Sequence, residues 1–208
     1  MKNLLILFIL FHGLNPKIQA QTVTIGTQVW MTKNLDVSTF RNGDPIPEAK
    51  TRDQWDKASS EGKAAWCYFE YKKKNGKKYG KLYNWYAVND SRGLAPIGYH
   101  VPSEEEWKIL ESYLGEKPGK KMKFIKGWNN NGNGNNESGF SGLPGGYIGS
   151  KGSYTPTLGE DASWWSSSEY NTFFAYYRKC SFNSDNLFHL DNYGLSKLEG
   201  LSVRCVKD

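Results

Sequence analysis

One histidine precedes three consecutive glutamates in the segment "YHVPSEEEW", residues 99–107. An imidazole and a carboxylate within hydrogen-bond reach of each other can act as general acid and base. His100, with Glu105 or Glu106, is therefore the first candidate for chemistry.

A second set of acidic residues, Glu160 and Asp161 with Glu137, could provide paired carboxylates for hydrolysis. The chain contains no Gly-x-Ser-x-Gly segment of the kind that presents a serine nucleophile. A hydrolase using His100 and nearby carboxylates is thus an alternative, and the sequence favours a protein that is not an enzyme.

The three glutamates also have a structural explanation. Ser103 and Glu106 match a capping box, in which each side chain bonds a backbone N–H of the other residue at a helix start. Trp107, Leu110 and Leu114 then form the buried stripe of an amphipathic helix, which Gly115 ends. We therefore expect the helix to use the glutamates, and His100 to be a core or loop histidine that is also a candidate ligand contact.

An asparagine- and glycine-rich segment over residues 129–149 is the next candidate site. Such composition is typical of a long structural loop that needs left-handed backbone positions. It is also compatible with a ligand or cation loop, in which Asn136 and Glu137 supply oxygen donors. Calcium is the cofactor that this second interpretation predicts.

Aromatic residues are abundant, with 8 Trp, 13 Tyr and 10 Phe. Their rings stack on sugars and anchor protein interfaces. Trp164, Trp165 and Tyr147 are the ligand-binding candidates. Adjacent residues on a strand point to opposite faces, so we expect one tryptophan in the core and the other exposed or covered by a loop.

The first 20 residues have the pattern of a secretory signal, with Lys2, an apolar run over residues 4–11 and Ala20 before the expected cleavage point. No later segment is apolar enough to span a membrane. We expect an exported protein that is secreted, periplasmic or on the bacterial cell surface.

The chain has a net charge of +6, and loss of Lys2 and Lys17 with the signal lowers it to +4. The dense lysine run over residues 72–78 contains Asn75-Gly76, which predicts a solvated hairpin tip. Nucleic acid is not an expected partner.

Export makes a disulfide plausible among the three cysteines. Cys180 with Cys205 is the predicted pair, because both lie in segments that read as neighbouring strands. Pairings with Cys67 stay open. The cysteine and histidine spacings do not match a structural zinc site.

The remaining patterns predict a single α+β domain over residues 21–208. Two short helices and long loops lie between runs of strands, which argues against alternating strands and helices. Helices are expected within 51–62 and 81–90 as well as after Ser103, and strands within 22–35, 64–71, 162–170, 173–182, 186–194 and 200–208.

Six segments in this order resemble the Fibrobacter succinogenes major paralogous domain family of exported bacterial proteins. They are "VWMTKNLDVSTFRNGDPIP", "YGKLYNWYAVND", "GLAPIGYHVPSEEEWKIL", "NNESGFSGLPGGY", "SWWSSSE" and "LSVRCVKD". The resemblance covers about residues 22–208. Many members carry a cysteine where this chain has Ala95, so the resemblance leaves the partner of Cys205 open between Cys180 and Cys67.

"YHVPSEEEW" and "LSVRCVKD" are more distantly similar to formylglycine-generating enzymes. That similarity implies a C-type-lectin-like fold, with two helices and a twisted, mainly antiparallel sheet. It does not extend to the active sites. The copper site needs two closely spaced cysteines, and Cys180 has no close partner. The related iron enzymes need three histidines, and only His100 and His189 follow the signal.

These observations favour an exported, non-catalytic binding module for a carbohydrate or a cell-surface protein. The Glu-Pro-Asn and Trp-Asn-Asp motifs of calcium-dependent sugar binding do not occur, so the lectin-like fold alone does not predict sugar binding. A structural or adhesive component of the cell envelope is the alternative from another class.

Overall fold

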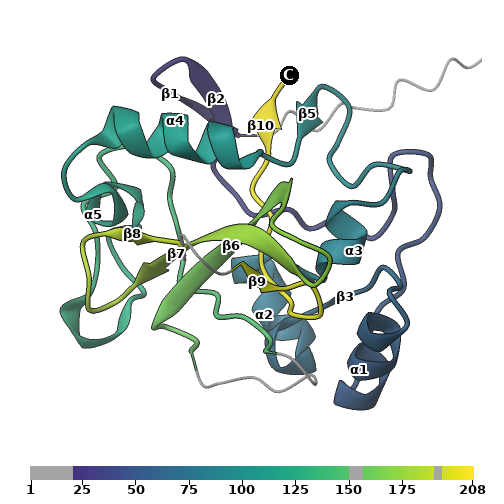
Figure 1. The fold of residues 1–208 in the computed structure, drawn as a ribbon. Helices are drawn as coiled ribbons and strands as arrows, with labels where there is room; N and C mark the ends of the chain where they lie inside the picture. The colour runs from purple at the N-terminus through teal and green to yellow at the C-terminus, as the bar shows by residue number, and fades with distance from the viewer. Residues whose placement is uncertain (1–20, 150–156, 190–193) are drawn as a thin grey trace, which may run out of the picture.

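The computed structural model describes residues 21–149, 157–189 and 194–208, and the expected signal peptide, residues 1–20, lies outside them. Short helices and strands alternate with long loops (Figure 1). None of the described helices is long and apolar enough to cross a membrane. The helices are α1 (Arg52–Ser60), α2 (Lys73–Tyr79), α3 (Trp85–Val88), α4 (Glu104–Leu114) and α5 (Pro118–Met122).

Every pair of named strands is antiparallel, which confirms the α+β class. The sheet orders are β1-β2-β10-β5, β3-β4 and β6-β7-β8, with β9 also on β7. The strands are β1 (Thr22–Ile25), β2 (Gln28–Met31), β3 (Trp66–Cys67), β4 (Leu82–Tyr83), β5 (Tyr99–His100), β6 (Asp161–Glu169), β7 (Phe174–Ser181), β8 (Leu187–Phe188), β9 (Leu195–Ser196) and β10 (Val206–Lys207).

The best-predicted elements are those with local signals. Gly26, at φ +60°, makes the turn of the predicted β1–β2 hairpin. Thr51 caps α1 through the backbone N–H of Gln54. The capping box of Ser103 and Glu106 begins α4, and Gly115 follows its last residue.

The lysine run was wrongly predicted as a hairpin tip, because it forms helix α2. Gly76 lies inside this helix, where a Cβ would come within 2.1 Å of the Tyr68 ring. The glycine therefore allows close packing and does not make a turn.

Two other elements differ from prediction. The strand expected over 64–71 ends at Cys67, since Glu70 and Tyr71 take positive φ values in a 3₁₀ turn. The helix expected over 81–90 is divided into β4 and α3, because the Asn84 side chain caps α3 at the Ala87 N–H. The described residues thus contain five α-helices, whereas the expected fold class had two and the local patterns predicted helices in three segments.

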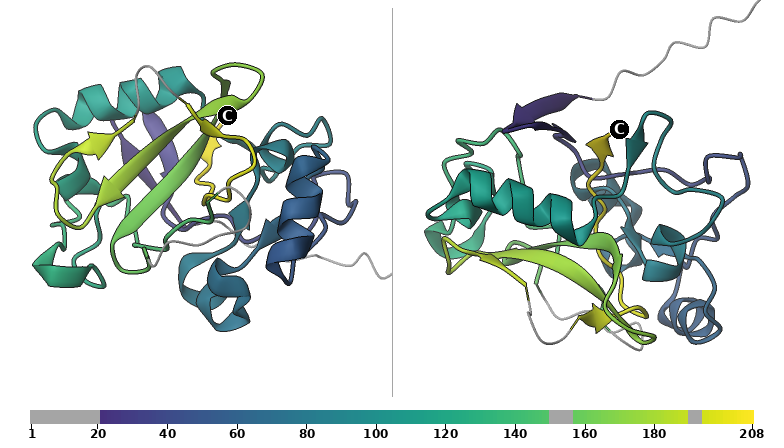
Figure 2. Two further views of the ribbon diagram at one scale, coloured as in Figure 1. Left: turned by 60° about the horizontal axis from the view of Figure 1, so that its bottom comes forward. Right: turned by 45° about the horizontal axis from the view of Figure 1, so that its top comes forward.

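Both faces of the long β6–β7 pair are covered, as Figure 2 shows for the face under α4. Trp164 lies in one apolar core with Trp107 and Cys180, and Trp165 lies in another with Tyr83 and Cys205. Both tryptophans are fully buried. The expectation that only one would be in the core was therefore wrong, because each face of the strand has a core of its own.

The predicted Cys180–Cys205 disulfide is also wrong, because all three cysteines are free and buried. Cys180 belongs to the core around Trp107, Cys205 to the core around Tyr83, and Cys67 to a third cluster with Trp55. Burial raises the pKa of Cys180 and of Cys205 to about 12, so both thiols stay protonated near neutral pH.

Candidate functional site

His100 connects three parts of the chain. It lies on β5 opposite Val206 of β10. Its Nε2 lies 2.6 Å from Glu106 Oε1 and its Nδ1 lies 2.8 Å from Asp208 Oδ1. Both ring nitrogens are therefore occupied by carboxylates, which leaves neither one available to a substrate in this arrangement.

The charges in this cluster stabilise each other. Burial alone would lower the pKa of His100, but hydrogen bonds with Asp208 and Glu106 outweigh burial and raise it. Burial alone would raise the pKa of Glu106, but hydrogen bonds from Ser103 and His100 outweigh it and lower the pKa. The predicted acid–base pair is thus an ion-paired link between α4, β5 and the segment after β10.

Glu104 and Glu105 differ sharply in environment. Glu104 is buried and accepts two hydrogen bonds, of 2.8 and 2.9 Å, from the fully buried Arg178 of β7. Glu105 is exposed. Sequence reasoning missed Arg178, because its pairing with Glu104 joins residues far apart in the chain.

Two members of the second acidic set form ion pairs with lysines. Asp161, at the start of β6, lies 2.9 Å from Lys179. Glu137 lies 3.8 Å from Lys121. Asp161 and Glu137 are therefore each close to a different lysine.

The aromatic candidates contribute to the interior. Trp164 donates its indole N–H to Asn34, and Trp165 donates to the Tyr83 carbonyl. Tyr147 is half-buried and packs against the core of Trp165. The buried rings of Trp164 and Trp165 offer no face to a ligand.

Asn136 and Glu137, the expected calcium ligands, form hydrogen bonds within their own loop. Asn136 Oδ1 accepts from the Ser141 N–H at 2.8 Å, and its Nδ2 donates to Ser141 Oγ. Glu137 accepts from Asn135. No group of three or more His, Cys, Asp and Glu side chains in the described residues is placed to hold a metal ion. The prediction of calcium gains no support from these contacts.

The same loop borders a hollow of about 500 Å³, named here the asparagine hollow. One side is formed by residues 130–133, and the facing side by residues 182–185 after β7. Lys120 and Lys123 complete its lining.

Two glycines hold this loop against its neighbours. A Cβ on Gly132 would lie 2.1 Å from the Phe182 carbonyl oxygen, and one on Gly134 would lie 2.3 Å from that of Lys123. The backbone N–H groups of Gly134 and Asn135 donate to the carbonyls of Phe124 and Lys120. The loop is thus packed and hydrogen-bonded before any ligand arrives.

Asn130 and Asn131 have features that the packing of the loop does not explain. Both adopt the left-handed backbone conformation, at φ +49° and +61°. Asparagine tolerates this region better than most residues, yet it is a strained conformation that recurs at functional sites. Both side chains are exposed, and neither amide has a hydrogen-bond partner among the described residues. Sequence reasoning placed the ligand groups of this loop at Asn136 and Glu137 instead.

The other asparagines of the hollow are used within the chain. Asn133 Oδ1 accepts from the Trp128 N–H, and Asn183 Oδ1 accepts from Ser181. The unpaired donors and acceptors are therefore concentrated at Asn130 and Asn131.

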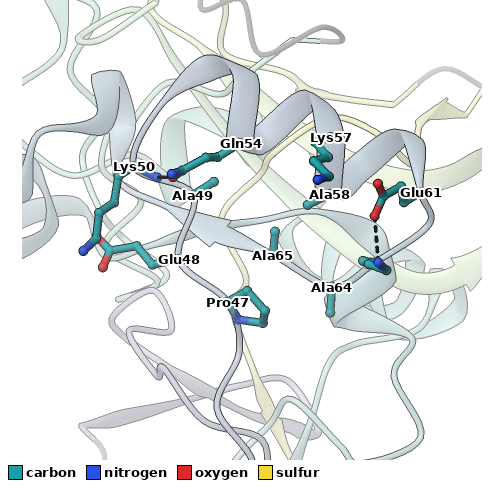
Figure 3. A pocket seen from close by; sticks show the side chains of 11 residues that line it. Pro47, Glu48, Ala49, Lys50, Gln54, Lys57, Ala58, Glu61, Ala64 and Ala65 are labelled. Carbon is teal, nitrogen blue, oxygen red and sulfur yellow. Dashed lines mark hydrogen bonds and ion pairs between the residues drawn. The ribbon is translucent and has the colours of Figure 1, made fainter.

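A groove of about 390 Å³ lies between α1 and the segments 47–50 and 63–65 (Figure 3). Its small apolar side chains are Pro47, Ala49, Ala58, Ala64 and Ala65. Two of its polar groups are already paired: Glu61 with Lys63 at 2.7 Å, and Gln54 with the Lys50 N–H at 2.8 Å. Its other polar side chains, Glu48, Lys50 and Lys57, include no amide, whereas the asparagine hollow has several.

The arrangement is suited to holding a polar ligand. The asparagine hollow combines amide donors and acceptors with two lysines and Asp185. The asparagine run at 129–131 was the sequence signal for it, since this residue type favours left-handed turns.

The comparison with family models agrees with the six segments noted in the sequence. The model of the Fibrobacter succinogenes major domain matches residues 23–207. No curated protein and no solved structure matches the chain. The match spans nearly all of the described residues, and the chain belongs to the Fibrobacter succinogenes major domain family.

Proposed function

We propose that the protein is a non-catalytic binding module that holds a carbohydrate in the asparagine hollow. The observation that carries this proposal is the pair of unpartnered amides of Asn130 and Asn131, on a loop that the fold already holds in place. A pre-formed loop binds without the entropy loss of ordering itself.

The chemistry of the hollow matches sugar hydroxyls. Each hydroxyl donates one hydrogen bond and accepts others, and each asparagine amide offers both functions on adjacent atoms. Lys120 adds donors, Asp185 adds acceptors, and Phe182 adds a half-buried ring for an apolar sugar face.

Two further expectations belong to this proposal. The signal-like residues 1–20 support export to the periplasm, the cell surface or the medium. The antiparallel strands and long loops are compatible with a C-type-lectin-like fold. Neither expectation identifies the sugar.

A broad glycan and polysaccharide array probed with residues 21–208 is the test, with calcium in one arm and chelator in another. The proposal expects a reproducible hit. Equal binding in both arms would show that the sugar is held without calcium. A blank array from protein that melts cooperatively would contradict carbohydrate binding.

A blank array would favour the second candidate, an adhesive component of the cell envelope. Exposed aromatic residues at the tip of the β6–β7 hairpin support that candidate. Phe173 is 72% exposed and Phe174 is 37% exposed, beside the edge-to-face pair of Tyr170 and Tyr176. Under this candidate, Phe173→Ser should reduce the adhesion of cells that display the protein.

A further inference from the structure

A second hollow, of about 320 Å³, lies between helix α2 and the loop after β2. It is named here the basic hollow. Four cationic side chains line it, and Asp36 is its one carboxylate. The cations are Lys33, Lys77, Lys78 and Arg204.

Arg204 forms part of the wall and is only 1% exposed. Its Nη1 donates to the carbonyls of Met31, at 3.0 Å, and Phe140. Its Nε and Nη2 both donate to Asn34 Oδ1, at 3.2 and 2.8 Å. Nη2 carries two N–H groups, so one of them has no acceptor among the described residues.

No carboxylate neutralises Arg204 within the described part of the chain. The contacts that compensate it are carbonyls, one amide oxygen and the Phe140 ring, 4.2 Å from the guanidinium carbon. Burial lowers the pKa of Arg204 to about 9. Burying a cation without a counter-ion destabilises the folded state, and an anion bound nearby would offset this destabilisation.

The three lysines are also unneutralised. Lys33, Lys77 and Lys78 are exposed, and none has an ion pair within the described residues. Asp36 does not neutralise these lysines, because its carboxylate pairs with the ammonium group of Lys81 at 2.6 Å. Lys81 is not part of the lining of the hollow.

Other residues of the lining hold the wall of the basic hollow in place. Asn34 donates to the Tyr79 carbonyl at 2.9 Å, which ties the end of α2 to the loop after β2. Gly80, at φ +78°, brings its backbone against the Leu35 carbonyl oxygen, 2.9 Å from where a Cβ would lie. The cationic side chains are therefore held around a pre-formed hollow that also contains the hydroxyls of Thr32 and Ser141.

We infer that the basic hollow is a binding site for an oxyanion group, such as a sulfate, phosphate or carboxylate carried by a ligand. The lysines would contact the oxyanion directly, and Arg204 would add positive charge from the wall. Charge-assisted hydrogen bonds from lysine are the contacts expected at such a site. The site is separate from the asparagine hollow, with which it shares no lining residue.

The test measures binding of sulfate, phosphate and acetate to residues 21–208 by calorimetry and thermal melting, against chloride at equal ionic strength. The variant is Lys77→Gln/Lys78→Gln. Its matched control is Lys73→Gln/Lys74→Gln, which removes the same charge from the same helix outside the hollow. The three anions distinguish a tetrahedral group from a carboxylate.

We expect saturable binding of at least one anion, about tenfold weaker in Lys77→Gln/Lys78→Gln and unchanged in the control. The inference would be overturned if none of the three anions bound saturably, or if anion binding were weakened equally in both variants. Asn130→Gly/Asn131→Gly should leave anion binding intact. Its result therefore separates a failure of this inference from a failure of the carbohydrate proposal.

Discussion

Glu104, Glu105 and Glu106 are consecutive in the sequence, but their side chains have different environments. Glu106 completes the cap of α4 and holds His100, Glu104 neutralises buried Arg178, and Glu105 lies in solvent. The cap was predictable because its partners are three residues apart. The pairing with Arg178 was not, since it depends on how β7 packs under the helix.

Glu104→Ala should lower the free energy of unfolding by about 3–5 kcal/mol, because it removes both hydrogen bonds to the buried Arg178 and leaves only the longer, 3.6 Å contact with Glu111. Glu105→Ala, the matched control on the same helix turn, should change it by less than about 0.5 kcal/mol. Urea denaturation of both variants provides the measurement. Similar losses in the two would contradict the buried pair.

The His100 cluster should make stability depend on pH. The pKa of His100 is raised in the folded protein, so its contribution is fully present below the unfolded value of 6.5 and is lost as pH rises through the raised value. The pKa of Glu106 is lowered, so its contribution is present above the unfolded value of 4.5 and is lost at more acidic pH.

Thermal melts from about pH 5 to pH 8 check this expectation. The melting temperature of the native protein should exceed that of His100→Gln most at the acidic end, and the difference should shrink as pH rises. His189→Gln serves as the control for losing an imidazole elsewhere. A difference that does not change with pH would mean that His100 does not ionise within the cluster.

At the scale of elements, the position of β6 explains why Trp164 and Trp165 are both buried. Strand alternation correctly placed Trp164 and Trp165 on opposite faces, but it could not reveal that a core covers each face. Likewise, the asparagine-rich composition identified the loop. The pairing of Asn136 with Ser141, and the exposure of Asn130 and Asn131, depend on how the loop packs against α5 and against the segment after β7.

Trp164→Ala and Trp165→Ala should each destabilise the fold by about 3–5 kcal/mol, because each leaves a large cavity in a packed core. Chemical denaturation followed by circular dichroism measures the loss. Any binding lost in these variants should return when the assay temperature is low enough for them to fold. If a variant kept full stability but lost binding, the substituted tryptophan would be a ligand contact after all.

At the scale of the whole molecule, the three free cysteines are distributed among the three apolar clusters. Cys67, Cys180 and Cys205 each fill a different apolar cluster, and no disulfide joins them. The family and the α+β class were predictable from motifs spread along the chain. The cysteine partners were not, because a pairing depends on the distance between elements that sequence order does not give.

We expect the three thiols to resist a thiol-specific reagent in the folded protein and to react together when it unfolds, since burial keeps them protonated and inaccessible. Absorbance during titration with denaturant measures this reactivity. A reductant should leave the melting temperature unchanged. Detection of fewer than three thiols in the unfolded, unreduced protein would contradict the free cysteines.

Binding of a glycan identified on the array to Asn130→Gly/Asn131→Gly is the most direct test of the proposed function. Glycine keeps the left-handed backbone available and removes only the amides. Asn135→Gly, in the same loop but outside the lining of the hollow, is the control. The proposal predicts that calorimetry will show affinity reduced at least about tenfold in the double variant and kept in the control. Full affinity in a folded double variant would contradict binding in the asparagine hollow.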